Sequence, residues 1–251
     1  MHALSAIAIA CVLMLPNGSI DAAEIKVLSG NGARAAVRAL SAQFERASGH
    51  KVAIHFEVNS ALKRKIEAGE SFDVAVLNPP VLDALIKEGK VVAGTRAGIG
   101  RAGLGVGVRV GAPKPDIGSV AAFKHTLLNA RTVAYPGEGA SGVYFTGLVD
   151  RLGIGAEMKP KMRPMAAEDT VEVVARGEAD LVVVVASRIS NVPGVELVGL
   201  IPSELQTWIG FAAGVGSAAK EPAAALALVR FLSASAAAPV LKALGVEPHP
   251  Q

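Results

Sequence analysis

Short runs of β-branched residues alternate with longer amphipathic stretches along most of this chain. The first unit is the clearest, because residues 25–29 (IKVLS) predict a strand, residues 30–32 (GNG) a tight turn and residues 33–48 a helix. The apolar side chains of that helix recur on one face, at Ala36, Val37, Leu40 and Phe44. Gly49 follows, where glycine adopts the left-handed conformation that ends a helix. This alternation predicts an α/β fold in which helices cover mainly parallel strands.

Two more strand-turn-helix units follow the first. Residues 52–58 predict a strand that leads through Asn59 and Ser60 into a helix, and residues 72–77 (FDVAVL) predict a strand that leads through Asn78 into another. A second α/β set then begins. It comprises predicted strands at residues 132–135 and 181–186, and predicted helices at residues 142–152 and about 170–176.

Two extended segments separate and rejoin these sets. Residues 99–110 are rich in Gly and Val, and residues 206–215 are again apolar, so both are predicted to be strands that cross between lobes. The tail, residues 221–244, predicts one amphipathic helix. The crossings divide the chain into a discontinuous first lobe, residues 24–105 plus 214–251, and a second lobe, residues 106–213. The predicted fold is α/β with two lobes, each a mixed sheet flanked by helices, joined by two hinge strands.

The N-terminus has the features of an export signal. Residues 4–15 (LSAIAIACVLML) form an apolar run too short to span a bilayer, and we expect residues 1–23 to be a signal peptide. Lys and Arg are absent before the run, so a buried N-terminal helix remains an alternative interpretation. Cys11, the only cysteine, also allows a lipoprotein site. Because it lies in this segment, the processed chain would have no disulfide and no reactive thiol.

Charge and composition exclude several classes of function. The chain carries 25 Lys and Arg against 22 Asp and Glu, a formal charge of +3 that hints at anionic ligands. Aromatic residues make up 4% and basic residues are scattered, so no nucleic-acid partner is expected. The sequence has no GxSxG motif, and no metal-ligand spacing relates His50, His55, His125 and His249. Neither a metal nor a cofactor is predicted.

A glycine pattern raises one alternative. Gly30 and Gly32 with Ala35 after a strand, and Glu57 in the next strand, imitate a dinucleotide-binding fingerprint. The export signal, the long gap to Glu57 and the lack of a hydride-transfer pair favour a tight turn instead. The ligand domain of a transcription regulator shares the predicted architecture, but no helix-turn-helix is predicted in these 251 residues.

Five blocks of sequence together carry a family resemblance. They are residues 25–52, 60–76 (SALKRKIEAGESFDVAV), 137–154 (GEGASGVYFTGLVDRLGI), 167–187 and 225–248. In order and spacing they resemble the molybdate-binding, ModA-like family of periplasmic binding proteins of type II fold. The resemblance implies a monomeric protein of the periplasm that captures a small anion between its lobes for an ABC permease in the inner membrane.

The strand-to-helix turns carry the candidate site, because helix N-termini that face a cleft favour negative charge. The resemblance places the ligand-binding residues in these turns, at Asn31, Gly32, Arg34, Asn59, Ser60, Asn78, Ser141 and Thr170. The Arg34 guanidinium would provide the planar, two-armed donor that carboxylates prefer. The polar residues also suit ordinary helix caps, and Arg34 also suits a solvated helix surface.

Several positions depart from the molybdate site of that family. Gly32 replaces a serine, Leu77-Asn78-Pro79 replace a Ser-Ala-Asp turn, and Val185 stands where a tyrosine hydroxyl would reach the oxyanion. The lost hydroxyls remove donors that a small tetrahedral dianion needs. An organic carboxylate is therefore predicted instead of molybdate.

An enzyme on the same scaffold is the alternative function. Some proteins that share it resemble aconitate isomerases, in which a closed cleft binds a tricarboxylate and a base moves a proton. Glu138, or the pair Glu168 and Asp169, would supply that base here, and helix capping is the other explanation for these carboxylates. No catalytic residue is assigned, and an enzyme of this kind would be an isomerase that acts by proton transfer.

Overall fold

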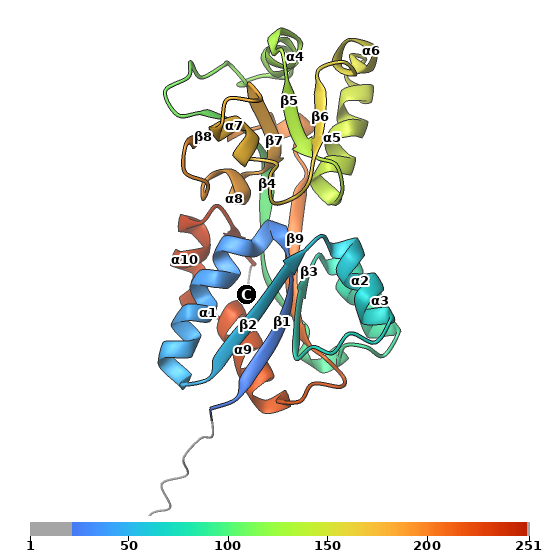
Figure 1. The fold of residues 1–251 in the computed structure, drawn as a ribbon, viewed down its shortest axis with the longest axis vertical. Helices are drawn as coiled ribbons and strands as arrows, with labels where there is room; N and C mark the ends of the chain where they lie inside the picture. Colours follow the sequence, from blue (N-terminus) through green and yellow to red (C-terminus); the bar gives the residue numbers. More distant parts are fainter. Residues whose placement is uncertain (1–21, 250–251) are drawn as a thin grey trace, which may run out of the picture.

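Two α/β lobes lie end to end, and the chain passes twice between them (Figure 1). The computed structural model describes residues 22–249, so nearly all of the predicted signal peptide, together with its alternatives, lies outside the described residues. The sheet of lobe one begins with three parallel strands, in which β1 lies between the other two. They are β1 (Glu24–Gly30), β2 (Lys51–Glu57) and β3 (Val74–Leu77). The α/β pattern predicted for this lobe is confirmed.

Helices cover both faces of the lobe one sheet. Figure 1 shows α1, α9 and α10 on one side of it and α2 and α3 on the other. Their bounds are α1 (Arg34–Ser48), α2 (Asn59–Glu67), α3 (Pro79–Lys87), α9 (Pro222–Ser233) and α10 (Ala238–Ala243). A 3-10 turn, Asn31–Ala33, precedes α1, and Gly49 ends α1 with a φ of 78°, as predicted.

Lobe two repeats the arrangement with its own helices. The parallel strands β5 (Val133–Pro136), β6 (Met162–Met165) and β7 (Leu181–Val185) form its sheet with the second half of β4 and with β8, where β4 is Ala97–Arg109 and β8 is Val195–Leu200. Its helices are α4 (Val120–Asn129), α5 (Ala140–Arg151), α6 (Gly155–Met158), α7 (Glu172–Ala175) and α8 (Ala186–Ile189). The two-lobed fold of the sequence prediction is confirmed.

The two crossings meet at one point. Ala97 to Gly103 of β4 pair with β9 (Trp208–Val215) in lobe one, and β4 from Leu104 onward pairs with β7 and β8 in lobe two. The side-chain amide of Gln206 accepts a hydrogen bond from the Leu104 N–H at 2.8 Å and donates one to the Leu104 carbonyl at 3.0 Å. The lobe boundaries at 105/106 and 213/214 stay a prediction, although these pairings favour assigning β9 wholly to lobe one.

Two helices differ from their predictions. The tail predicted as one helix is broken between α9 and α10, where Ala234 is extended at φ −67° and ψ 151° and Pro239 opens α10. Proline has no N–H and clashes with the preceding turn, so an uninterrupted helix is excluded there. The helix predicted near residues 170–176 is the single turn α7, which Gly177 ends with a φ of 75°. No strand or helix was predicted for β6, β8 or α4.

A buried aspartate ties three segments of lobe one together. The Asp73 carboxylate is 4% exposed and accepts hydrogen bonds from the backbone N–H groups of Lys26 at 2.8 Å, Lys220 at 2.7 Å and Glu221 at 3.3 Å. It thereby fixes the start of α9 against β1.

Within residues 22–249, no single helix is long and apolar enough to cross a membrane. Two consecutive helical segments, Pro222–Ser233 and Ser235–Ala243, have the required length and hydropathy together, but they are bent by 57° relative to each other.

Candidate functional site

A cavity of about 60 Å³ lies between the lobes, and we call it the inner cavity. Lobe one contributes the turns after β1, β2 and β3 with part of β9, and lobe two contributes the turn after β5, the start of α5 and the turn after β7. Ligands of open α/β sheets bind at such carboxyl ends of strands. The predicted residues that line this cavity are Asn31, Gly32, Asn59, Asn78, Ser141 and Thr170.

Two of the asparagines present hydrogen-bond donors to the inner cavity. The Asn59 Oδ1 accepts from the backbone N–H of Asn78 at 2.9 Å, and the Asn31 Oδ1 accepts from Nη2 of Arg34 at 2.5 Å. An amide whose oxygen is engaged in this way has its NH₂ group left to donate. The NH₂ groups of Asn31 and Asn59 are thus available as neutral donors, and their predicted role in ligand binding stays a prediction.

Two other predicted residues, Asn78 and Thr170, donate a proton to the protein itself. The Asn78 NH₂ group donates to the Gly210 carbonyl at 2.8 Å, and the Thr170 hydroxyl donates to the Ala166 carbonyl at 2.8 Å. A carbonyl can only accept, so it fixes the orientation of the amide as well as that of the hydroxyl. Thr170 thereby uses its only proton, whereas Asn78 keeps a second N–H, so the role of the two residues toward a ligand stays a prediction. The Asn78 Oδ1 and Thr170 Oγ1 atoms also keep lone pairs that can accept a hydrogen bond.

Arg188 supplies the positive charge of the inner cavity, and sequence reasoning missed it. It lies in α8, directly after β7, and its side chain is 11% exposed. Its Nη2 donates to the Ala167 carbonyl at 2.9 Å and lies 3.6 Å from a Glu172 carboxylate oxygen. Arg188 follows a predicted strand closely, as Asn31, Asn59 and Asn78 do, so the same sequence pattern could have indicated it. A charged donor held in this way is suited to bind a carboxylate.

Ser141 and Glu138 add polar groups from lobe two. Both line the inner cavity beside the start of α5, and neither side chain makes a hydrogen bond within the described part of the chain. The Ser141 hydroxyl can donate or accept, and the Glu138 carboxylate can accept a proton from a bound molecule.

Arg34 lies outside the inner cavity. It lines a neighbouring chamber of about 690 Å³, here called the outer chamber, which shares Asn31, Val58, Glu138 and Ala167 with the inner cavity. Its guanidinium carbon lies 4.9 Å from the centre of the Phe56 ring. Burial, followed by the charges of Arg188 and Arg38, lowers the pKa of Arg34. Arg34 thus orients Asn31 and faces the route into the inner cavity.

Ser60 is the other predicted residue that the inner cavity does not include. It is exposed in the first turn of α2, and it lines neither the inner cavity nor the outer chamber. Its neighbour Asn59 points a donor into the site instead. The turn was therefore predicted correctly, but the two adjacent polar side chains of the turn diverge.

One wall of the inner cavity is apolar. Val184, Val185, Ile209 and Phe211 line it, and Phe211 explains the glycine at position 32. A Cβ atom added to Gly32 would lie 2.8 Å from the Phe211 ring, closer than real Cβ contacts. A serine there would displace the ring. The absent serine and the buried Val185 are thus parts of one apolar surface.

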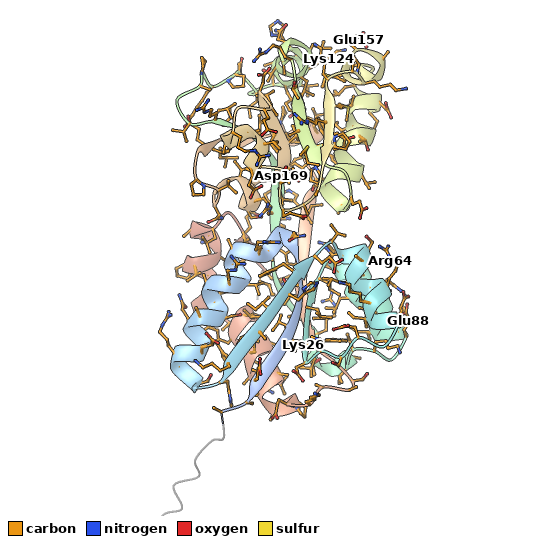
Figure 2. The ribbon with its side chains drawn as sticks, in the orientation of Figure 1. Lys26, Arg64, Glu88, Lys124, Glu157 and Asp169 are labelled. Atoms are coloured by element: carbon orange, nitrogen blue, oxygen red, sulfur yellow. The ribbon has the colours of Figure 1, made fainter. Side chains whose placement is uncertain are left out.

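The three carboxylates weighed as a catalytic base lie in different surroundings. Asp169 pairs with Arg176 at 2.7 Å, and this hydrogen bond lowers the pKa of Asp169, so it is held ionised on the surface of lobe two (Figure 2). Glu168 lines the outer chamber. Glu138 alone among the three lines the inner cavity.

Residues 22–249 contain no cluster of three His, Cys, Asp or Glu side chains able to hold a metal ion.

The lobes also touch beside the inner cavity. The Ser187 hydroxyl of α8 donates to the Gly32 carbonyl at 2.8 Å, and a Cβ added to Gly245 would lie 3.1 Å from Ser187 Cα. Two lobes in contact, two hinge crossings and a cavity between them with polar and apolar walls define a binding protein of the type II periplasmic class.

Comparisons with known proteins agree with this class. The model of the bacterial extracellular solute-binding protein family matches residues 25–247, and the chain belongs to this family. It is 34% identical to an aconitate isomerase of Pseudomonas sp. over 232 residues, 90% of this chain and 88% of the relative. It is 30% identical to the molybdate-binding protein ModA of Azotobacter vinelandii over 241 residues, 90% of each chain. The ModA-like resemblance is thereby confirmed.

Solved structures show the same fold. The periplasmic molybdate-binding protein of Azotobacter vinelandii superposes with a TM-score of 0.76 at 20% identity, covering 90% of this chain and 100% of that one. The sulfate-binding protein SubI of Mycobacterium tuberculosis superposes with a TM-score of 0.68 at 18% identity, covering 90% of this chain and 87% of that one. Two-lobed anion-binding proteins therefore share this architecture.

Proposed function

We propose that this protein captures a small organic carboxylate in its inner cavity, in the periplasm, and delivers it as a monomer to an ABC permease in the inner membrane. The observation that supports the ligand class is the two-sided lining. Arg188, Asn31, Asn59 and Ser141 supply donors on one part of the wall, and apolar side chains form the other. A carboxylate attached to a carbon skeleton has the same division into a charged end and an apolar body.

A molybdate ion suits this lining less well. A fully ionised tetrahedral oxyanion presents acceptors in every direction, so each oxygen needs a donor. Here Phe211 and Val185 offer none, and Asn78 and Thr170 present acceptors of their own. An oxygen that faces such groups would lose the hydrogen bonds it makes to water. Molybdate would therefore bind weakly.

A thermal-shift screen tests the proposed function. We expect mono-, di- or tricarboxylates at millimolar concentration to raise the melting temperature, because a ligand that binds only the folded state stabilises it. At a hundredfold excess over the Kd the gain is about 2.7 kcal/mol. Molybdate and sulfate are expected to leave the melting temperature unchanged. A clear shift with micromolar molybdate and none with any carboxylate would overturn the proposed ligand class.

An isomerase is a second candidate function. Two observations favour it, the 34% identity to an aconitate isomerase and the Glu138 carboxylate beside the inner cavity. Glu138 would remove a proton from a carbon next to the ligand's C=C bond. The double bond would shift, and the proton would return at the other end of the three-carbon unit, so no co-reactant is consumed.

Proton exchange tests this second function. With cis- or trans-aconitate in D₂O, an isomerase is expected to incorporate deuterium at the carbons that exchange protons, and NMR detects it. Glu138→Gln should lower the incorporation by about a hundredfold or more while keeping aconitate binding, since general bases contribute about 10²–10⁴-fold. Glu168→Gln serves as the matched control from the outer chamber. Binding of both isomers without any incorporation would exclude the isomerase.

A further inference from the structure

The inner cavity contains acceptors as well as donors, and both walls present one. Asn78 Oδ1 comes from the end of β3 in lobe one, and Thr170 Oγ1 comes from the segment before α7 in lobe two. We propose that the natural ligand is a hydroxycarboxylate, whose hydroxyl group donates to these acceptors while its carboxylate binds Arg188 and the neighbouring donors. This inference rests on the proposed carboxylate-binding function and narrows it to one chemical class.

The Asn78 acceptor is fixed by two contacts of the same residue. Its NH₂ group is bound to the Gly210 carbonyl of β9, and its backbone N–H is bound to Asn59. As the residue before α3 it makes no side-chain cap hydrogen bond, so within residues 22–249 its Oδ1 has no protein donor. A ligand that offers only ionised oxygens would place an acceptor against this acceptor. A hydroxyl would instead complete the hydrogen bond.

The Thr170 acceptor is the more deeply buried of the two. The residue is 1% exposed, yet it lines the inner cavity, and its only proton goes to the Ala166 carbonyl. Buried polar atoms usually have a hydrogen-bond partner, and Oγ1 keeps a lone pair for a group bound in the cavity that Thr170 lines. A hydroxyl donor from the ligand is the matching group.

A hydroxyl fits these acceptors better than an ammonium group does. Asn78 and Thr170 are neutral acceptors that a hydroxyl satisfies, whereas a buried ammonium group would need a carboxylate in direct contact. Glu138 is the carboxylate of this cavity, so amino analogues are part of the test below. The carboxylate of the ligand is matched by the single positive charge of Arg188, the only Arg or Lys side chain among the described residues that line the inner cavity. The volume of about 60 Å³ suits a small acid, and a longer one would extend past Asn31 into the outer chamber.

Matched pairs of acids test the inference directly. Isothermal titration of the full processed chain would compare lactate with propionate, D- and L-malate with succinate, and citrate with tricarballylate. Each pair has the same carboxylates and differs by one hydroxyl. At least one hydroxylated member is expected to bind about tenfold or more tightly than its partner, because a site built for a hydroxyl is left with unpaired atoms when the hydroxyl is missing. Alanine and aspartate are included as amino analogues.

A Thr170 series assigns the preference to the site. Thr170→Val keeps the side-chain shape but removes the lone pair together with the hydrogen bond to the Ala166 carbonyl. Because only the lone pair is expected to contact the ligand, the change should reduce the hydroxyl preference several-fold and leave the affinity for the deoxy acid within about twofold. Thr170→Ser keeps the hydroxyl and should retain the preference. The melting temperature of each ligand-free variant shows that it folds.

The outcomes separate this inference from the proposed function. Equal binding within every pair, or tighter binding of the deoxy or amino analogues, would overturn the hydroxycarboxylate and leave the carboxylate-binding function standing. If none of these acids binds, the proposed function fails with it. A hydroxyl preference that Thr170→Val leaves unchanged would contradict the assignment to Thr170.

Discussion

Replacing Arg188 by alanine is expected to weaken carboxylate binding by about a hundredfold, whichever acid proves to be the ligand. The side chain is 11% exposed, lines the inner cavity and is held by the Ala167 carbonyl, and the nearest carboxylate oxygen, of Glu172, lies 3.6 Å away. Hydrogen bonds to charged groups contribute about 1.5–3 kcal/mol each, and 2.7 kcal/mol is roughly a hundredfold in Kd. Isothermal titration with the acid that gives the largest thermal shift measures the change.

Two other arginines serve as controls for this substitution. Arg34→Ala is expected to weaken binding less, about fivefold, because Arg34 acts on the inner cavity through Asn31 and lines only the outer chamber. Arg176→Ala, which removes a surface partner of Asp169, should leave the affinity unchanged. If Arg34→Ala abolished binding while Arg188→Ala kept it, the assignment of the two arginines would be reversed.

Replacing Asp73 by alanine is expected to lower the free energy of unfolding by about 3 kcal/mol, a large effect for a residue outside the inner cavity. The carboxylate accepts from three backbone N–H groups, of Lys26, Lys220 and Glu221, and is nearly inaccessible to water. Without it these groups are left unpaired or must open to water, and each buried unpaired group costs about 1–3 kcal/mol. Urea denaturation of the ligand-free protein measures the loss.

A surface carboxylate provides the comparison. Asp83 pairs with Arg96 on the exposed side of α3, and Asp83→Ala should change the free energy of unfolding by less than about 1 kcal/mol. Asp73→Asn keeps one acceptor and should lie between the two. Equal effects of Asp73→Ala and Asp83→Ala would contradict the role of Asp73 in fixing α9 to β1.

The position of the site was largely predictable, but the direction of its side chains was not. The turns after the first three strands follow from local pattern, and they place Asn31, Asn59 and Asn78 at the inner cavity. Whether an amide presents its oxygen or its nitrogen depends on a partner far away in sequence. Asn78 is bound to Gly210, 132 positions later, and no local pattern contains that contact.

The missed residues share this long-range origin. Phe211 lies in a strand of lobe one and closes the site against Gly32, which lies almost 180 positions earlier in the chain. Arg188 follows Val185, a position at which the sequence indicated only the absence of a tyrosine hydroxyl. The strand at residues 181–186 was predicted, but the turn after it was not expected to contribute to the site, and Arg188 was therefore missed. Side-chain direction depends on how the lobes meet.

By itself, the sequence determined the alternation of strands and helices, the two crossings and the chemical character of the turns, because hydrophobic periodicity, glycine and proline act over a few residues. Only the tertiary structure decided which residues line the inner cavity and which of their atoms the protein itself engages. The lobes are built from segments that lie far apart in the chain. Their packing assigns Arg188 to the inner cavity, Arg34 to the outer chamber, and one amide proton of Asn78 and the hydroxyl proton of Thr170 to backbone carbonyls. Hydrogen bonds are directional and short, so a site made from both lobes is specified only when the lobes come together.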